Sequence, residues 1–169
     1  ARALSKPYKG NRQNPKPFHF KNLTHYISYR YDTNIANGYE ADDLISSVQF
    51  SRLDKRDTII CTRDKDLRQC PGWHYGWECG RQPEFGTVEY DDFGTLTLVK
   101  GASGNKLVGG GKKFFFGQLL TGDVVDNIGG LNQTGPVKAY NALAEANTEE
   151  DCRTIIRDMY KSTYPDKWL

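Results

Sequence analysis

The sequence has few of the features that would anchor a protein in a membrane or cross-link it. Its 169 residues include only four cysteines, unevenly spread, which argues against a disulfide framework. We therefore expect reduced thiols and a cytosolic protein. No apolar run approaches the roughly 20 residues that a helix needs to cross a bilayer, so we expect no membrane partner.

The net charge is also small. The chain carries 23 Lys and Arg against 21 Asp and Glu, a net charge of +2, which by itself indicates nothing about nucleic acid. The distribution is more informative, because residues 1–21 are free of Asp and Glu. Their basic residues are Arg2, Lys6, Lys9, Arg12, Lys16 and Lys21. Acidic residues gather in short groups further along, and this asymmetry suggests a polyanion held near a cation site.

Hydrophobic periodicity predicts an α/β fold, for which one domain is enough at this length. We predict helices over residues 20–32, 39–49, 112–121, 136–146 and 148–161, and a buried strand over residues 57–62. The Gly-rich and aromatic stretch 69–111 contains an alternating segment typical of a β-hairpin.

Several residues carry specific signals within these predicted helices. Glu40 falls in the first turn of the second helix, whose inward stripe is formed by Leu44, Ile45 and Val48. Pro136 suits the first position of its helix. Thr148 is predicted to cap the last helix, with Asp151 completing a weaker form of the capping box.

Carboxylates gather at three element boundaries. They are Glu40, Asp42 and Asp43; Asp64 and Asp66; and Asp123 and Asp126. Glu40 and Asp43 would share a helix face, and Asp64 follows a strand, where open α/β sheets place ligand sites. Many carboxylates without histidine suit Mg²⁺ or Mn²⁺ better than zinc. Two such ions, roughly 4 Å apart, can activate water and stabilise the leaving oxygen of a phosphodiester, so the pattern predicts hydrolysis.

Other interpretations exist for these residues. Each acidic group alone is commonly a helix N-terminal charge or a solvated face. Cys61, Cys70, His74 and Cys79 could ligate zinc, but their spacing lacks the paired CxxC motif. We expect Cys61 to be a small core residue in its strand instead.

Aromatic and histidine residues are open to two interpretations. Trp73, Tyr75 and Trp77 could stack on single-stranded bases, but their alternation fits one face of a strand, and we favour packing. We expect His19 and His25 at the surface or facing DNA, because two-metal hydrolysis needs no histidine base.

The order and spacing of the acidic motifs resemble the 5′-nuclease or flap endonuclease family, and phage 5′-exonucleases in particular. The matching motifs are Glu40-Ala41-Asp42-Asp43, Thr62-Arg63-Asp64-Lys65-Asp66 and Gly122-Asp123-x-x-Asp126-Asn127-Ile128. The resemblance extends from about Tyr8 to Ala146, without the Gly-rich stretch. It implies a PIN-like sheet core flanked by helices, in which the seven carboxylates bind two Mg²⁺ or Mn²⁺ ions.

Two further motifs extend the resemblance. Tyr8-Lys9-Gly10-Asn11-Arg12 is similar to the family's basic arch motif, which implies that Lys9 and Arg12 act at the scissile phosphate. Residues 127–130 and 135–138 resemble a helix-three-turn-helix motif, which grips duplex DNA through backbone amides, often with a monovalent cation such as K⁺. Ordinary turn chemistry is the alternative for its glycines. The implied DNA-binding residues are Lys6, Lys16, Gly129, Gly130, Gly135 and Lys138.

The resemblance also implies an organisation and a function. Residues 1–121 would form the metal-binding core with the arch segment and the Gly-rich insert, and residues 122–169 the DNA-binding region. In the family a strand precedes the arch and helices follow the DNA-binding turn, so we expect either a fragment or a second polypeptide that supplies the strand. We expect a 5′-nuclease of phage replication or recombination, acting in the host cytosol on duplex DNA with a single-stranded 5′ end or flap. The alternative is a non-catalytic DNA-binding module.

Overall fold

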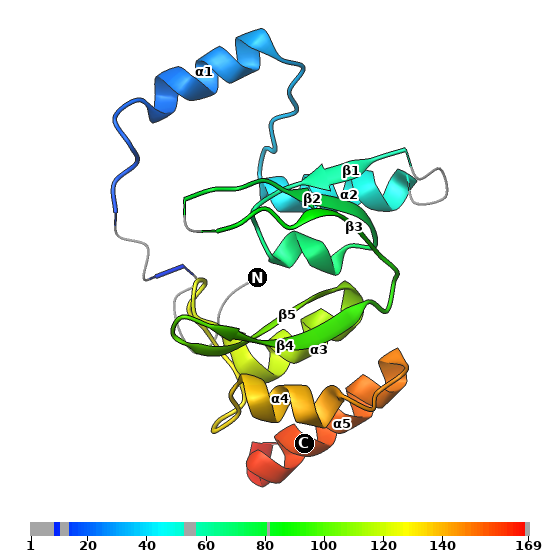
Figure 1. The fold of residues 1–169 in the computed structure, drawn as a ribbon. Helices are drawn as coiled ribbons and strands as arrows, with labels where there is room; N and C mark the ends of the chain where they lie inside the picture. Colours follow the sequence, from blue (N-terminus) through cyan, green and yellow to red (C-terminus); the bar gives the residue numbers. More distant parts are fainter. Residues whose placement is uncertain (1–8, 11–13, 53–56, 81, 168–169) are drawn as a thin grey trace.

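The computed structural model describes residues 9–10, 14–52, 57–80 and 82–167 and has a mixed α/β architecture (Figure 1). This confirms the predicted α/β class. The α-helices of this described part are α1 (Phe20–Arg30), α2 (Ala41–Arg52), α3 (Gly111–Thr121), α4 (Pro136–Leu143) and α5 (Glu149–Thr163), with short 3₁₀ helices η1 (Asp66–Gln69) and η2 (Pro165–Lys167). None of these helices has the length and apolar character needed to span a bilayer.

The strands form small separate sheets. In the first sheet, β1 (Ile59–Cys61) pairs in parallel with β2 (Gly72–Gly76), and β2 pairs antiparallel with β3 (Gly86–Tyr90). β4 (Thr95–Gly101) and β5 (Gly104–Gly110) form the predicted hairpin. β6 (Gly122–Asp123) and β7 (Ile128–Gly129) form a short antiparallel pair. The Gly-rich stretch therefore supplies β2 to β5, which lie in the middle of the molecule (Figure 1).

The larger core joins α3, α4 and α5. Its buried residues are Phe116, Leu120, Leu131, Ala139, Leu143, Ala146, Cys152 and Ile156, and the hairpin adds Leu96 and Leu107 at its edge. Local signals start two of these helices as predicted. Pro136 lies in the first turn of α4, and Thr148 caps α5 in a full capping box with Asp151. A second, small cluster consists of Ile60, Leu67 and Cys70 and holds β1 against η1.

The first two helices differ from the predicted packing. α1 forms as predicted, but all its residues are exposed and it lies away from the body between two extended segments (Figure 1). α2 begins at Ala41, so Glu40 precedes the helix instead of lying in its first turn. Ile45 and Val48 are 40% and 48% exposed, so the predicted inward stripe is wrong at these two positions, whereas Leu44 is half-buried.

The side of α2 that packs inward is polar because it meets backbone groups. Gln49 is only 3% exposed. Its amide donates to the carbonyl of Pro71 at 3.1 Å and accepts from the hydroxyl of Thr58 at 2.9 Å. A buried carbonyl without a partner costs free energy, so a side chain that can donate is favoured at this position over an apolar one.

The strand that follows is only partly buried. In β1, Ile60 is buried, whereas Ile59 and Cys61 are exposed. The prediction that Cys61 is a core residue is therefore wrong. β1 is the edge strand of its sheet among the described residues, and its second face is uncovered. Trp73 and Tyr75 lie in β2 as predicted and are partly buried, while Trp77 lies just beyond the strand.

Gly130 is required because two backbone segments approach closely. An added Cβ would lie 2.3 Å from the carbonyl carbon of Thr121 and 2.4 Å from the nitrogen of Gly122, whereas at Gly129 no atom lies within 4 Å. Gly130→Ala should lower the free energy of unfolding by about 1–3 kcal/mol, as overpacked sites do. Gly129→Ala should change it by less than about 0.5 kcal/mol. Urea denaturation measures both, and equal effects would contradict this packing.

Candidate metal centre

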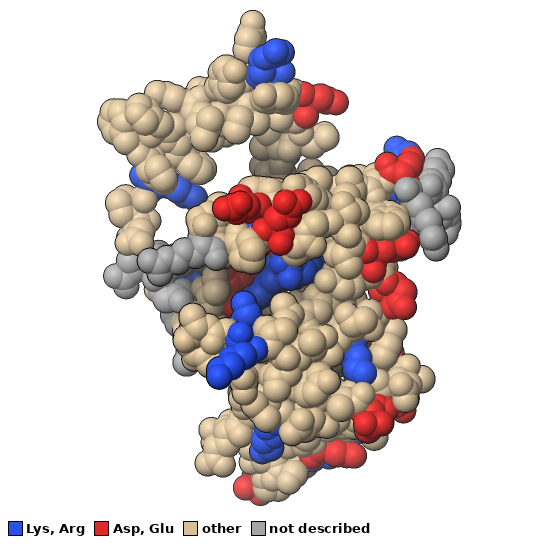
Figure 2. All heavy atoms as spheres, viewed as in Figure 1, with Lys and Arg blue, Asp and Glu red and all other residues tan. Residues whose placement is uncertain are grey.

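Carboxylates from all three acidic motifs line one cleft of about 660 Å³. They are Asp42, Asp64, Asp66 and Asp126, and Lys9 lies on the same lining. The cleft lies between the β1–β3 sheet and the β4–β5 hairpin, where basic side chains also gather (Figure 2). Residues separated by more than 80 positions in the sequence therefore meet at one site.

Three of the aspartates come especially close together. Asp66 begins η1, Asp123 ends β6, and Asp126 lies in the turn between β6 and β7. One carboxylate oxygen of each lies within 4.8 Å of the others, so the three could hold a metal ion. In the described part of the chain, no other group of His, Cys, Asp and Glu residues meets this condition.

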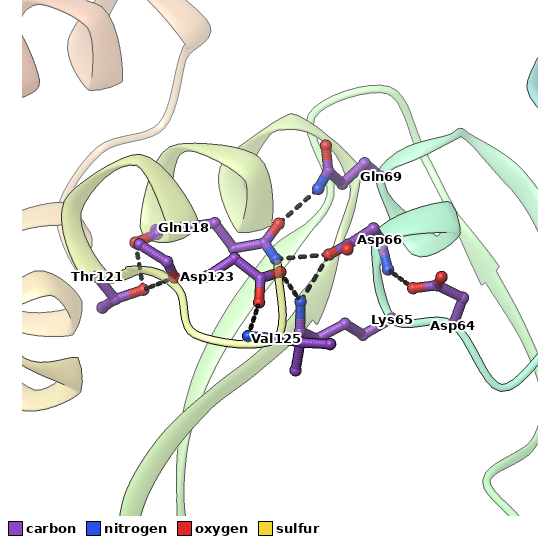
Figure 3. Close-up of polar contacts among 10 residues, drawn as sticks. Asp64, Lys65, Asp66, Gln69, Gln118, Thr121, Asp123 and Val125 are labelled. Carbon is purple, nitrogen blue, oxygen red and sulfur yellow. Dashed lines mark hydrogen bonds and ion pairs between the residues drawn. The ribbon is translucent and has the colours of Figure 1, made fainter. Parts of the chain in front are cut away.

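Lys65 lies between two of these carboxylates. Its Nζ is 2.8 Å from Oδ1 of Asp66 and 2.5 Å from Oδ2 of Asp123 (Figure 3). Burial by itself would lower the pKa of Lys65, but its hydrogen bonds to Asp123 and Asp66 outweigh burial and raise the pKa. The ammonium group is therefore charged at neutral pH and partly balances the carboxylates.

The side chain of Asp123 is the most enclosed of the residues around Lys65, with 11% of its surface exposed. Burial would raise its pKa, but the hydrogen bond and charge of Lys65, followed by the backbone N–H groups of Val125 and Asp126, lower the pKa overall. The N–H of Val125 donates to Oδ1 of Asp123 at 2.9 Å. Asp123 is consequently ionised at neutral pH, as a metal ligand must be.

Neutral groups orient Asp66. The side-chain amide of Gln118, on α3, donates to Oδ1 of Asp66 at 2.6 Å, and Gln69 donates to the amide oxygen of Gln118 at 2.5 Å (Figure 3). On the other side, the N–H of Asp66 donates to Oδ1 of Asp64 at 3.0 Å. Such outer contacts fix the direction of a ligand carboxylate.

Three of the seven predicted carboxylates do not line this cleft: Asp123, which meets Asp66 and Asp126 beside it, and Glu40 and Asp43. Glu40 forms an ion pair with Lys9, whose Nζ is 2.6 Å from Oε1. Asp43 accepts a hydrogen bond from the N–H of Glu40 at 3.2 Å. Their side chains lie at the start of α2 but not among the residues that line the cleft.

The predicted basic and glycine residues lie in different places. The N–H of Lys9 donates to the carbonyl of Asp126 at 3.1 Å, which fastens this segment to the turn that carries the carboxylate. Lys16 is exposed, with Nζ 4.6 Å above the ring of Phe20. Gly135 and Lys138 are exposed at the start of α4. Lys6 and Arg12 lie outside the described residues.

The residues of the alternative zinc interpretation are not brought together. Cys61 and Cys79 are exposed, whereas Cys70 is buried. His74 is fully buried, with Nε2 2.8 Å from the carbonyl of Cys70. The other two histidines, His19 and His25, are exposed, as expected.

Two residues of the candidate centre, Lys65 and Gln118, were not predicted from the sequence. Lys65 lies between two acidic residues in the sequence, which could have marked it as their counter-ion. Gln118 offered no comparable signal, because it becomes important only when α3 packs beside η1. Comparisons of the chain with known protein families, curated proteins and solved structures gave no significant match.

Removal of the Lys65 ammonium should strengthen metal binding, because an ion near Asp66 and Asp123 has to displace it. We expect Lys65→Met to raise the affinity for Mn²⁺ at least about fivefold, equivalent to roughly 1 kcal/mol for a lost charged hydrogen bond. Lys100→Met, which removes an exposed lysine from β4, is the matched control. Isothermal titration calorimetry provides the measurement, and equal affinities in all three proteins would contradict the assignment.

Proposed function

We propose that this protein is a divalent-metal-dependent 5′-nuclease that hydrolyses DNA phosphodiesters. The observation that carries the proposal is the convergence of carboxylates from three separate motifs on one cleft, together with the close approach of Asp66, Asp123 and Asp126. An all-oxygen donor set suits Mg²⁺ or Mn²⁺. The motif order that resembles 5′-nucleases supports the same reaction.

The proposed roles follow from the geometry. Asp66, Asp123 and Asp126 would hold one ion, and Asp42 and Asp64 are the carboxylates on the cleft that would help to hold a second. A bound pair of ions would supply an activated water and stabilise the leaving oxygen. Lys9 lies on the cleft and is tied to Asp126, so it would counter charge at the reacting phosphate, together with Arg12.

Duplex DNA would bind at the turns between α3 and α4, as in a helix-three-turn-helix. Gly135 precedes an exposed helix N-terminus, where phosphate is favoured, and Lys138 is exposed one turn later. A monovalent cation such as K⁺ would bind at these turns. Of the glycines assigned to this motif, Gly129 and Gly135 have open space around them, whereas Gly130 faces the end of α3.

A further strand would complete a PIN-like core. The edge strand β1 exposes Ile59, and α2 exposes Ile45 and Val48, which are surfaces that an added strand or helix could cover. Another segment or a second polypeptide would supply it.

The second candidate function is a DNA-binding module that does not cleave. The observation that favours it is the Lys65 ammonium, which lies between Asp66 and Asp123 and balances part of their charge.

Loss of ligand oxygens should abolish both metal binding and cleavage. In the double variant Asp66→Asn with Asp123→Asn, we expect Mn²⁺ binding to disappear and cleavage of a 5′-flap substrate to fall at least about 100-fold, because the ions lose their charged ligands. Asp158→Asn, an exposed change on α5, is the control. Circular dichroism verifies the fold. Full cleavage by the double variant would exclude this metal centre.

Binding and chemistry should separate on mutation. Lys9→Ala should slow single-turnover cleavage at saturating enzyme by about tenfold or more, because its charge acts at the reacting phosphate. Lys138→Glu should weaken DNA binding while leaving the saturated rate near normal. Lys100→Glu controls for general charge reversal. If Lys9→Ala changes only affinity, the segment around Lys9 is a tether without a role in the chemistry.

A further inference from the structure

Part of the cleft lining is built by the Gly-rich stretch, to which the resemblance assigns no role. Its lining residues include Gln82, Pro83, Glu84 and Phe85 from the β2–β3 connection, and Lys106, Leu107 and Val108 from β5. Arg63 and Arg68 lie on the same lining. Basic side chains are visible here between the β1–β3 sheet and the hairpin (Figure 2).

The guanidinium of Arg63 holds this part of the lining through hydrogen bonds. Its guanidinium donates to the side-chain oxygen of Gln82 at 2.7 Å, to the carbonyl of Pro83 at 3.2 Å and to the carbonyl of Trp77 at 2.5 Å. These bonds fix the β2–β3 connection. The position of Phe85 is also restricted, because its ring packs directly against Gly76. A Cβ added at Gly76 would lie only 1.8 Å from Cε1 of that ring.

Arg68 lies on the cleft lining and forms no ion pair with a described residue. Its guanidinium lies 4.2 Å from the centre of the Phe85 ring. Its Nε is buried and has no hydrogen-bond partner, and its side chain forms no ion pair with any described residue. Burial lowers the pKa of Arg68 and the like charge of Arg63 acts in the same direction, while the charges of Tyr90 and Asp64 oppose them in part. A guanidinium that is desolvated in this way favours an anion that can accept from its donors.

Lys106 provides a second cation on the cleft lining. It lies on β5, is exposed, and its ammonium is engaged by no side chain in the described part of the chain. By contrast, Lys9 and Lys65 on the same cleft are paired with Glu40 and with Asp66 and Asp123. Of the acidic residues on this side, Glu84 is engaged by the hydroxyl of Tyr75. Arg68 and Lys106 are therefore the cations of this lining whose charged groups have no hydrogen-bond or ion-pair partner among the described residues. The carboxylates of Asp42 and Asp64 on the same lining also form no ion pair with a described residue.

We propose that Arg68 and Lys106 each contact phosphates of the nucleic-acid strand that lies in the cleft. The inference rests on the proposed function, because the carboxylates of the same cleft would repel a polyanion unless cations lie beside them. Phe85 and Arg63 position Arg68. The contacts are to phosphate, so the subsite does not distinguish base sequence.

The test measures binding without metal, so that it does not depend on the metal centre. Fluorescence anisotropy with a short fluorescein-labelled oligothymidylate in EDTA gives the affinity between about 50 and 200 mM salt. Arg68→Gln and Lys106→Gln should each weaken binding about fivefold and reduce the slope of log affinity against log salt by about 1. Lys100→Gln, on the same hairpin but outside the cleft lining, should change affinity less than about twofold.

Two outcomes would overturn the proposal. In the first, both cleft variants bind the oligonucleotide like Lys100→Gln. In the second, inorganic phosphate displaces the oligonucleotide at an equal concentration of phosphate groups, which indicates a site for free phosphate. If Arg68→Gln does not fold because the half-buried Arg68 is needed for stability, Lys106→Gln still tests the proposal. Failure of the metal centre would appear separately, as absent Mn²⁺ binding with unchanged oligonucleotide binding.

Discussion

The mutual repulsion of three carboxylates is the constraint on which the rest of this structure depends. Asp66, Asp123 and Asp126 place oxygens within 4.8 Å of one another. At an effective dielectric of about 20, each such pair repels by roughly 3 kcal/mol, and less where water screens it. Lys65 and Gln118 offset part of this repulsion through hydrogen bonds. Three carboxylates held this close together would be stabilised further if a divalent cation replaced the singly charged Lys65 ammonium.

The fold holds these groups in place from two separate cores. The α3–α5 core fixes the end of α3, from which the turn with Asp123 and Asp126 follows. The small cluster of Ile60, Leu67 and Cys70 fixes η1, which begins with Asp66. The contacts of Gln118 with Asp66 and Gln69 join the two. The centre therefore lies at the junction of the two cores, and its geometry depends on how closely they pack.

The features that could be predicted from the sequence are those that depend on local signals, namely helix starts and a hairpin. The starts of α4 and α5 follow from Pro136 and from the Thr148 capping box, and the hairpin follows from alternation. The side of α2 that packs inward did not follow from hydrophobic periodicity. Its buried residue, Gln49, is held there by a hydrogen bond to the carbonyl of Pro71, 22 residues away. In the centre, the acidic motifs were located by spacing, but the pairing of Lys65 with Asp123 spans 58 residues and depends on tertiary packing. The position of Lys106 on the same cleft as the aspartates likewise depends on tertiary packing, because Lys106 lies in the Gly-rich stretch.

The most direct test of whether Asp66, Asp123 and Asp126 bind a metal ion is anomalous diffraction from crystals soaked in Mn²⁺. The account predicts a manganese peak in contact with Asp66, Asp123 and Asp126, with the Lys65 ammonium moved away from Asp123. Crystals without a peak at these carboxylates, or with Lys65 still bonded to Asp66 and Asp123 beside a peak elsewhere, would contradict it.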